Sequence, residues 1–459
     1  MIGKLLQPEF REMIGQRDFA GLRTMVGRWP PADLAEVIAD LSPTDQITVF
    51  RLIPKPQATA VFGYLGRDVQ ESLLRSLGSE DAVAVLNEMA PDDRTAMLEE
   101  LPPAALRHLL QMLSPAERAV ATRLLGYPER SVGRLMTPHF LAIGSGWTVA
   151  RVLEHIREHG AASETLNVLY VVDEGGRLVD DIGIRDILLR GPDTRISEIE
   201  DRHFIALHTT DDEEAAVGVF KRYDRHSLPV IDGDGVLVGI VTADDVWDVA
   251  EASATEDIHK IGGTESLEEP YLSIRIARMV RKRATWLVIL FLGEMLTASA
   301  MGFFEKEIER AVVLALFVPL IISSGGNSGA QAATLIIRAL ALGELTLGNW
   351  WRVMRREILS GLALGVILGT IGFLRITLWS LFGDLYGEHW LMVALTVALS
   401  LVGVVLWGSL AGSMLPFLLR RCGVDPATSS APFVATLVDV TGLVIYFSVA
   451  SVVLKGTLL

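Results

Sequence analysis

A single carboxylate stands near the middle of the last long apolar stretch of the chain. Residues 431–450 read APFVATLVDVTGLVIYFSVA, long enough to cross a bilayer, with Asp439 inside. An ionised side chain at that depth is energetically costly and usually faces a polar cavity or an ion path. The structural alternative is a buried Asp that accepts hydrogen bonds from Thr436 and Thr441. We favour the functional interpretation, because a carboxylate is a costly choice for a purely structural hydrogen bond.

A polar stretch also interrupts an earlier apolar segment, where residues 319–334 read PLIISSGGNSGAQAAT. Pro319 leaves a helix carbonyl without a donor, and Gly325-Gly326 lets the backbone bend or another helix approach. Polar groups at membrane depth are expected only where they line a cavity or are buried in protein. A tight helix contact through small residues is the alternative, and both interpretations can hold together. The polar residues are Ser323, Ser324, Asn327, Ser328, Gln331 and Thr334.

Acidic residues cluster in a predicted helix over residues 243–260. Asp245 and Asp248 are three apart and share one side of it, and Asp212 and Asp224 in the preceding region could face it. Clustered carboxylates repel one another unless a positive group lies between them, and hard divalent cations suit oxygen ligands. A solvated acidic helix is the alternative. The cluster comprises Asp244, Asp245, Asp248, Glu251, Glu256 and Asp257.

Composition divides the 459 residues into an acidic part and an apolar part. Residues 284–459 hold ten acidic and ten basic residues, so the net charge of −15 lies in residues 1–283. An acidic soluble part argues against nucleic-acid binding. The single cysteine, Cys422, excludes an intrachain disulfide and a multi-thiolate metal site. The N-terminus lacks a signal-peptide pattern, so we expect the soluble part to be cytoplasmic.

Two internal repeats define the soluble part. Over residues 32–126, apolar residues recur every twelve positions, as at Leu41, Ile53 and Leu65, with Pro or Gly after most repeats. This predicts an all-α solenoid of short helices in residues 1–130. Over residues 131–250, residues 169–179 match residues 228–238, and each half reads as an α/β unit.

The second repeat resembles a tandem pair of CBS domains, at residues 131–192 and 193–250, a regulatory module that often binds adenylates. In nucleotide-binding members a Thr and an Asp often hold the ribose. Thr242 and Asp245 keep this pattern in the second copy, whereas Gly183 replaces the Thr in the first. Binding of an adenylate such as ATP is therefore left open.

Residues 251–283 form a connecting helix and a basic linker, and an all-α transmembrane domain follows in residues 284–459. Arg278, Arg281 and neighbouring bases directly precede the first apolar segment and mark a cytoplasmic membrane face. Loop charges then predict a cytoplasmic N-terminus and an outside C-terminus. The five predicted spans are residues 284–304, 311–340, 357–382, 390–418 and 431–454.

The chain closely resembles the MgtE family of magnesium transporters. The resemblance lies in the order of the domains and in residues 254–262, 319–334, 425–427 and 433–443. The resemblance implies a homodimeric Mg²⁺ channel with an N domain, a CBS pair, a plug helix and five transmembrane helices. Helices two and five would line the pore. Asp439 would then hold hydrated Mg²⁺, with Asn327 and backbone oxygens around Ala435 completing the outer shell. Asp425 would lie at the cytoplasmic end of helix five.

The resemblance also implies cytosolic Mg²⁺ sensing between the N domain, the CBS pair and the plug helix. Ala60 and Ser253 depart from the family pattern, which has Glu at both positions, and Glu294 is an additional membrane carboxylate. The implied sensor residues are Asp92, Asp212, Asp224, Asp245, Asp248, Glu256 and Asp257.

The expected function is a homodimeric channel or transporter in the cell inner membrane that moves Mg²⁺ into the cytoplasm and is gated by cytosolic Mg²⁺. One alternative is a CBS-regulated, adenylate-sensing transporter of another divalent cation or solute. Another is a non-transporting membrane receptor. We do not expect an enzyme, because the sequence analysis identified no nucleophile–base pair, zinc-ligand spacing or phosphate loop.

Overall fold

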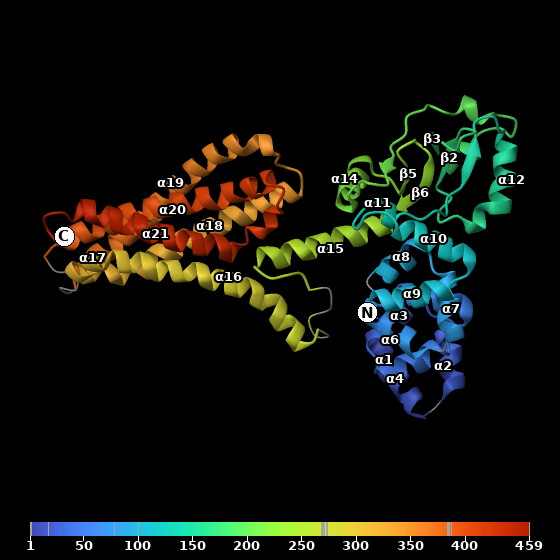
Figure 1. Ribbon diagram of the computed structural model, residues 1–459, viewed down its shortest axis with the longest axis horizontal. Coiled ribbons are helices and arrows are strands. Elements are labelled where there is room, and N and C mark those ends of the chain that lie inside the picture. The colour runs from blue at the N-terminus through green and yellow to red at the C-terminus, as the bar shows by residue number, and fades with distance from the viewer. Residues whose placement is uncertain are drawn as a thin grey trace. The chain divides into compact units, whose positions relative to one another are not determined.

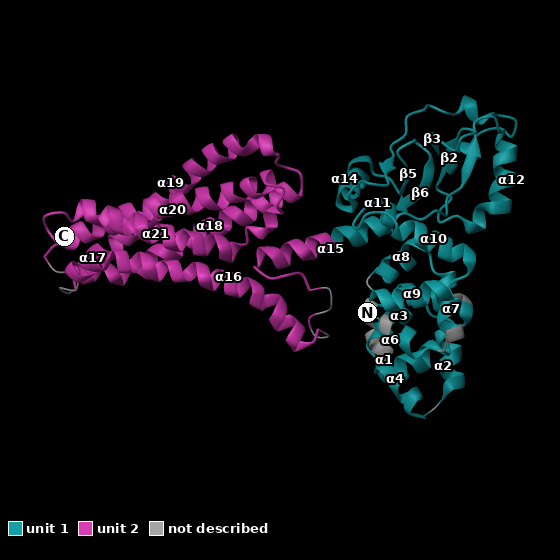
Figure 2. Ribbon diagram, in the orientation of Figure 1, with its two compact units in different colours: residues 1–251 teal, residues 252–459 magenta. Residues whose placement is uncertain are grey.

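The computed structural model describes residues 2–16, 18–77, 79–99, 101–267, 271, 274–382, 386 and 388–458. It divides into two compact units, residues 1–251 and 252–459, and each is described by itself (Figure 2). Gly78, one of the predicted repeat-ending glycines, and Asp384, one of the predicted outside-loop acids, lie outside the described residues.

The N-terminal part of the first unit is helical, as the twelve-residue repeat predicts (Figure 1). From α3 to α10 each helix begins twelve residues after the one before it. Several begin with Pro in the first turn, where a missing backbone N–H is tolerated. Repeat residues such as Ile38, Phe62 and Leu86 are fully buried and form the continuous core. The helices are α1 (Ile2–Gln16), α2 (Phe19–Val26), α3 (Pro31–Ala39), α4 (Pro43–Phe50), α5 (Lys55–Gly63), α6 (Arg67–Ser76), α7 (Ser79–Glu88), α8 (Pro91–Glu99), α9 (Pro103–Met112) and α10 (Pro115–Leu125).

The rest of the first unit contains two copies of one α/β pattern, which confirms the predicted duplication. In each copy the first strand pairs parallel with the second, and the second pairs antiparallel with the third. Gly176 and Gly235 occupy equivalent turns with φ of 76° and 81°. The first copy contains α11 (Val132–Leu135), β1 (Ala142–Gly144), α12 (Val149–His159), η1 (Gly160–Ala162), β2 (Val168–Val172), β3 (Leu178–Gly183) and α13 (Ile184–Leu188). The second contains η2 (Ile196–Glu198), β4 (Leu207–His208), α14 (Glu213–Tyr223), β5 (Ser227–Ile231) and β6 (Leu237–Thr242).

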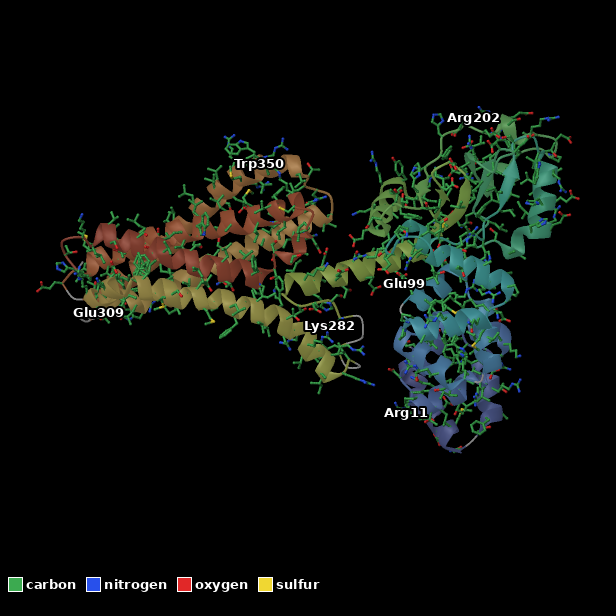
Figure 3. The ribbon with its side chains drawn as sticks, in the orientation of Figure 1. Arg11, Glu99, Arg202, Lys282, Glu309 and Trp350 are labelled. Atoms are coloured by element: carbon green, nitrogen blue, oxygen red, sulfur yellow. The ribbon has the colours of Figure 1, made fainter. Side chains whose placement is uncertain are left out.

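Helix α15 (Ala243–Ile261) begins in the first unit and ends in the second. Within the described residues, five helical segments of the second unit are long and apolar enough to cross a membrane. Helix α16 begins at Ile276 rather than at residue 284, because the basic cluster continues the helix; Lys282 lies in this extension (Figure 3). The elements are α16 (Ile276–Phe303), α17 (Glu305–Arg310), η3 (Val312–Phe317), α18 (Val318–Ala341), η4 (Leu347–Asn349), α19 (Trp350–Ser380), α20 (Trp390–Arg421), η5 (Pro426–Thr428) and α21 (Ala431–Val453).

Glycines let α18 and α20 pack with their backbones in contact. Gly325 and Gly329 face Gly408 and Gly412, and both pairs have the spacing of a close helix crossing. A Cβ atom added at Gly412 would lie 2.1 Å from the Gly329 carbonyl oxygen, and one added at Gly408 would lie 2.3 Å from that of Gly325. On this face of α18 the small residues therefore form a tight helix–helix contact, one of the two interpretations that the sequence left open.

Candidate ion-conducting and regulatory sites

The carboxylate of Asp439 lies on α21 beside α18. A Cβ atom added at Gly326 would lie 3.4 Å from Asp439 Oδ1 and 3.4 Å from Ala435 Cβ. Gly326 therefore lies directly beside both residues. Asp439 is half-buried, so part of its surface is open in the single chain.

The hydroxyl groups of Thr436 and Thr441 do not donate hydrogen bonds to Asp439. Thr436 Oγ1 donates to the carbonyl of Pro432 at 3.0 Å, one turn earlier. Thr441 Oγ1 donates to the carbonyl of Leu437 at 2.8 Å and accepts a hydrogen bond from Trp407 Nε1 at 2.7 Å. Each hydroxyl proton is directed to the backbone of its own helix. The carboxylate therefore remains available to a ligand.

The polar residues of α18 divide between two faces. The face toward the neighbouring helices buries Gly325, Gly326, Ser328 and Gly329, and Ser328 Oγ lies 2.7 Å from Ser409 Oγ on α20. Asn327 lies on the other face, where its Nδ2 donates to Ser323 Oγ at 3.4 Å. This exposed polar stripe comprises Ser323, Asn327, Gln331 and Thr334. Hydrocarbon does not suit such a stripe, so it requires water or another protein surface.

Glu294 of α16 belongs to the surroundings of Asp439. A Cβ atom added at Gly293 would lie 3.0 Å from Thr436 Cγ2, so α16 packs closely on α21 at this level. Glu294 also interacts electrostatically with Asp439. Two carboxylates of the apolar helices thus interact with each other, and their combined negative charge attracts a cation.

The end of α15 is joined through Asp425, which caps η5, to the segment that precedes α21. Lys260 Nζ donates to Asp425 Oδ2 at 2.6 Å and forms an ion pair with Glu256 at 2.5 Å. Trp286 of α16 donates from Nε1 to Ser430 Oγ at 3.1 Å, and Ser430 caps α21. Lys260 was not among the predicted site residues, and its local signal in the sequence is the spacing of four residues from Glu256.

A second group of carboxylates converges in the first unit. Burial raises the pKa of Asp92 well above its ordinary value, and Asp245, Asp93 and Glu164 add to the effect. Burial also raises the pKa of Asp245 to about 7, although Thr242 opposes the shift by hydrogen bonding to the carboxylate. The interacting acids, which we call the acidic cluster, are Asp92 and Asp93 of α8, Glu164, and Asp244, Asp245 and Asp248 of α15.

Asp92 is the most buried carboxylate of the acidic cluster. Its residue is only 7% exposed, and its Oδ1 has no hydrogen-bond partner among the described residues. A buried carboxylate oxygen of this kind requires a proton or a cation. Because the cluster supplies only oxygen donors, a hard divalent cation suits it.

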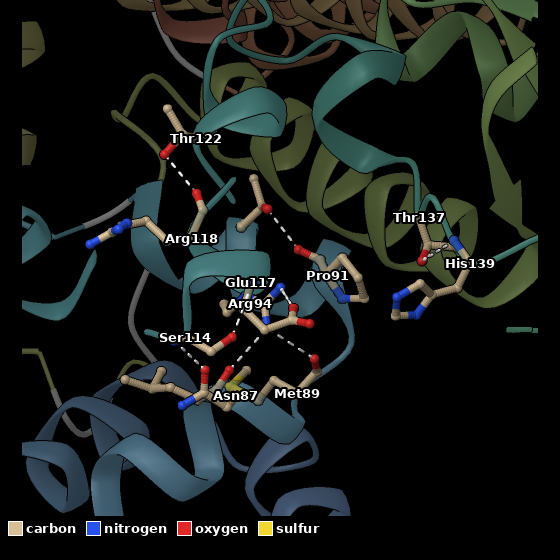
Figure 4. Close-up of polar contacts among 12 residues, drawn as sticks. Asn87, Met89, Pro91, Arg94, Ser114, Glu117, Arg118, Thr122, Thr137 and His139 are labelled. Carbon is tan, nitrogen blue, oxygen red and sulfur yellow. Dashed lines mark hydrogen bonds and ion pairs between the residues drawn. The ribbon is translucent and has the colours of Figure 1, made fainter. Parts of the chain in front are cut away.

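A buried arginine fixes the helix that carries Asp92. The Arg94 side chain is completely buried, and its Nη1 donates to the carbonyls of Leu86 at 3.1 Å and Met89 at 3.4 Å (Figure 4). Its Nη2 pairs with Glu117 of α10 at 2.5 Å. Helix α8 is thereby held to α7 and α10, so the Asp92 carboxylate has a fixed position.

Several predicted sensor residues lie elsewhere in the described chain. Asp212 caps α14 by accepting a hydrogen bond from Glu214 N, and Asp224 ends that helix with φ of 50°. Neither is among the charges that raise the pKa values in the acidic cluster. Glu256 and Asp257 belong to the second unit, and Ala60 is exposed on α5.

The acidic cluster also contains Asp93, Asp244 and Glu164, which are not among the predicted sensor residues. Asp244 already belongs to the acidic helix predicted over residues 243–260, and Asp93 adjoins the predicted Asp92 in the sequence. Glu164 follows η1 and is brought to the cluster only by folding.

The proposed adenylate residues contact each other. Thr242 Oγ1 donates to Asp245 Oδ2 at 2.5 Å. The same Asp245 belongs to the acidic cluster, so an adenylate and a cation would both depend on it.

Comparison with known proteins agrees with this division of the chain. Family models match residues 318–449 (MgtE, divalent cation transporter), 29–130 (MgtE intracellular N domain), and 132–192 and 196–246 (CBS domain). The magnesium transporter MgtE of Thermus thermophilus is 44% identical over 324 residues, which cover 71% of this chain and 70% of the relative. That of Enterococcus faecalis is 33% identical and covers 71% and 69%.

A solved structure supports the fold of the soluble part. The cytosolic domain of the Mg²⁺ channel MgtE in complex with ATP is 34% identical, with a TM-score of 0.51, covering 53% of this chain and all of that one. The described helices identify the present chain as a multi-pass membrane protein. From the family models and the extent of these identities, the chain belongs to the MgtE family of divalent cation transporters.

Proposed function

We propose that this protein is a Mg²⁺ channel or transporter that acts as a homodimer and is gated by cytosolic Mg²⁺. Its relatives in Thermus thermophilus and Enterococcus faecalis are magnesium transporters. The observation that carries the proposal is a half-buried carboxylate, Asp439, that lies beside Gly326 of α18 on a membrane-length helix. In this proposal Mg²⁺ enters the cytoplasm across the inner membrane, with the N-terminus cytoplasmic and the C-terminus outside.

Asp439 would hold Mg²⁺ through its water shell. Mg²⁺ dehydrates reluctantly and is typically bound by one or two carboxylates with several waters retained. The half-buried carboxylate beside Gly326 suits outer contact of this kind, and Glu294 adds negative charge nearby. Asn327 and the backbone near Ala435 would accept or donate hydrogen bonds to the waters.

A second copy of the chain would complete the pore. The exposed stripe of α18 (Ser323, Asn327, Gln331 and Thr334) presents polar groups where a single chain would meet lipid. Pairing two stripes across a shared axis would place them on a water-filled path beside two Asp439 carboxylates. Asp425 would mark the cytoplasmic end of that path.

The acidic cluster would act as the sensor. Bound Mg²⁺ compensates the facing carboxylates of α8 and α15 and favours the arrangement described here. Loss of Mg²⁺ leaves their mutual repulsion uncompensated and favours separation. The predicted sensor residues outside this cluster, Asp212, Asp224, Glu256 and Asp257, would contribute through other contacts of the dimer.

Regulation by ATP is a second proposal, because the cytosolic domain of a relative was solved with ATP and Thr242 and Asp245 retain the ribose-binding pattern. Since Asp245 also belongs to the acidic cluster, ATP would shift the Mg²⁺ concentration at which the channel closes. A transporter of another ion controlled mainly by adenylate would instead respond to ATP without Mg²⁺ inhibition.

Flux through purified protein in liposomes tests the proposal. Wild type should pass Mg²⁺ inward and lose activity as Mg²⁺ rises on the side of the soluble domains, whereas Asp439→Asn should reduce flux at least about tenfold. Glu344→Gln is the control, because this exposed carboxylate lies outside the five apolar segments. Undiminished flux in Asp439→Asn would overturn the pore assignment. Flux that does not change with the Mg²⁺ concentration on the side of the soluble domains would overturn the gating assignment.

A further inference from the structure

Three potential metal ligands stand together on α12, in the first CBS copy. His155, Glu158 and His159 occupy positions i, i+3 and i+4, so they share one helix face. One ligand atom from each residue lies within 4.8 Å of the other two. Among the described residues, these three therefore form a group that could hold a metal ion. The spacing of His155, Glu158 and His159 is visible in the sequence, so the expectation that the chain has no zinc-ligand spacing was wrong on this point. The site is separate from the all-oxygen acidic cluster.

Other contacts orient both imidazole rings. His155 hydrogen bonds to the backbone of Ala142 on β1, and its ring packs edge-on against Trp147 at 5.0 Å between centroids. His159 Nδ1 lies 3.4 Å from the carbonyl oxygen of His155. Metal-binding histidines usually direct one ring nitrogen to a carbonyl or carboxylate and the other to the metal. The two rings are stacked at an angle with centroids 4.5 Å apart, so they are already neighbours.

The surroundings of His155 also favour its neutral form, although Glu158 opposes the effect. Burial lowers the pKa of His155, and His159 and Arg151 lower it further. Arg151 is itself paired with Glu154 at 2.5 Å, which limits its repulsion of a metal ion. Glu158 Oε2 lies 3.9 Å from His159 Nδ1 and supplies a negative ligand on the same face.

We propose that His155, Glu158 and His159 form a surface site for a borderline transition-metal ion such as Zn²⁺, Co²⁺ or Ni²⁺, with water completing the coordination. Imidazole suits these ions, whereas Mg²⁺ prefers oxygen ligands. Tetrahedral bonds of about 2.0–2.1 Å place ligand atoms about 3.3 Å apart. The three ligand atoms must therefore move closer together to bind a metal ion. Rotation of the side chains can achieve this, because all three already lie on one face of α12. The site needs no movement of the backbone.

Titration of the purified full chain with Co²⁺ and Zn²⁺ tests this site. Millimolar Mg²⁺ is kept present so that oxygen-lined sites are filled, and Co²⁺ binding is followed by its visible absorption and Zn²⁺ binding by calorimetry. Wild type should show a Co²⁺ spectrum typical of nitrogen ligands. His155→Gln/His159→Gln should weaken binding by about tenfold or more and abolish that spectrum, and Glu158→Gln should weaken it less.

Two controls keep the result interpretable. His203→Gln removes an exposed histidine that has a carboxylate, Asp201, at 3.7 Å but forms no group of three potential ligands with the residues that the structure describes. This variant should bind the metals as wild type does. The single variant His159→Gln leaves the contact of His155 with Trp147 in place, and equal unfolding temperatures in chelator would show an intact fold. Unchanged Zn²⁺ affinity in His159→Gln and in the double variant would overturn the proposal, as would an equal loss in His203→Gln.

Discussion

Asp245→Asn should stabilise the soluble part of the protein in the absence of divalent cations. The substitution keeps the shape of the side chain and an oxygen that can accept from Thr242, but removes a negative charge from the acidic cluster. Burial raises the pKa of Asp245 from 3.8 to about 7, which corresponds to about 4 kcal/mol against the ionised folded form at neutral pH. Because Asp245 is partly exposed, solvent screening reduces this free-energy penalty. We therefore expect Asp245→Asn to raise the free energy of unfolding by about 2 kcal/mol.

The pH dependence follows from the direction of the pKa shift. The folded chain binds a proton at Asp245 more tightly than the unfolded chain, so ionisation of this carboxylate destabilises the fold increasingly from about pH 4 and fully above about pH 7. Protonation relieves this penalty as the pH falls through about 7 toward 4. The advantage of Asp245→Asn should therefore be largest near pH 8 and should vanish near pH 4.

Urea unfolding of residues 1–262 measures the effect. This fragment corresponds to the kind of cytosolic domain solved for a relative. Asp186→Asn is the matched control, since Asp186 is the counterpart of Asp245 in the first CBS copy and is not among the charges acting on the cluster. Added Mg²⁺ should stabilise wild type more than Asp245→Asn. It should therefore narrow or reverse the difference in free energy of unfolding between the two proteins. A less stable Asp245→Asn in chelator at pH 8, or a difference independent of pH, would refute the reasoning.

Three further substitutions test other parts of the structure. Gly412→Ala places a Cβ atom 2.1 Å from the Gly329 carbonyl oxygen, so it should force α18 and α20 apart and lower the stability of the solubilised protein by about 1–3 kcal/mol. Gly302→Ala is the control, because a Cβ atom added at this exposed glycine of α16 meets no atom within 4 Å among the described residues. Arg94→Met removes a fully buried charge and its hydrogen bonds and should destabilise the N-terminal helices by about 3–5 kcal/mol in urea unfolding; a change below 1 kcal/mol would contradict its assigned role. Lys260→Met removes the tie from α15 to the start of α21, so liposome flux should persist at higher Mg²⁺ than in wild type, and an unchanged inhibition curve would show that this contact does not hold the closed state.

The sequence by itself determined the elements, because their signals are local. The twelve-residue recurrence of apolar residues and prolines sets the start of each helix from α3 to α10. The duplicated strands and glycine turns specify two small sheets, and five long apolar runs can only satisfy their backbones in lipid as helices. Asp439 stood out because a carboxylate in such a run is rare.

Tertiary structure alone decided which side chains meet. The sequence showed acids in α8 and α15, but only folding brings Glu164 to them and leaves Asp92 Oδ1 without a hydrogen-bond partner among the described residues. Likewise, the small residues of α18 admitted two interpretations, and packing assigned Gly325 and Gly329 to helix contact and Asn327 to an exposed polar face. Periodicity gives the direction of a side chain on its own element, whereas its partner depends on contacts between residues distant in the sequence.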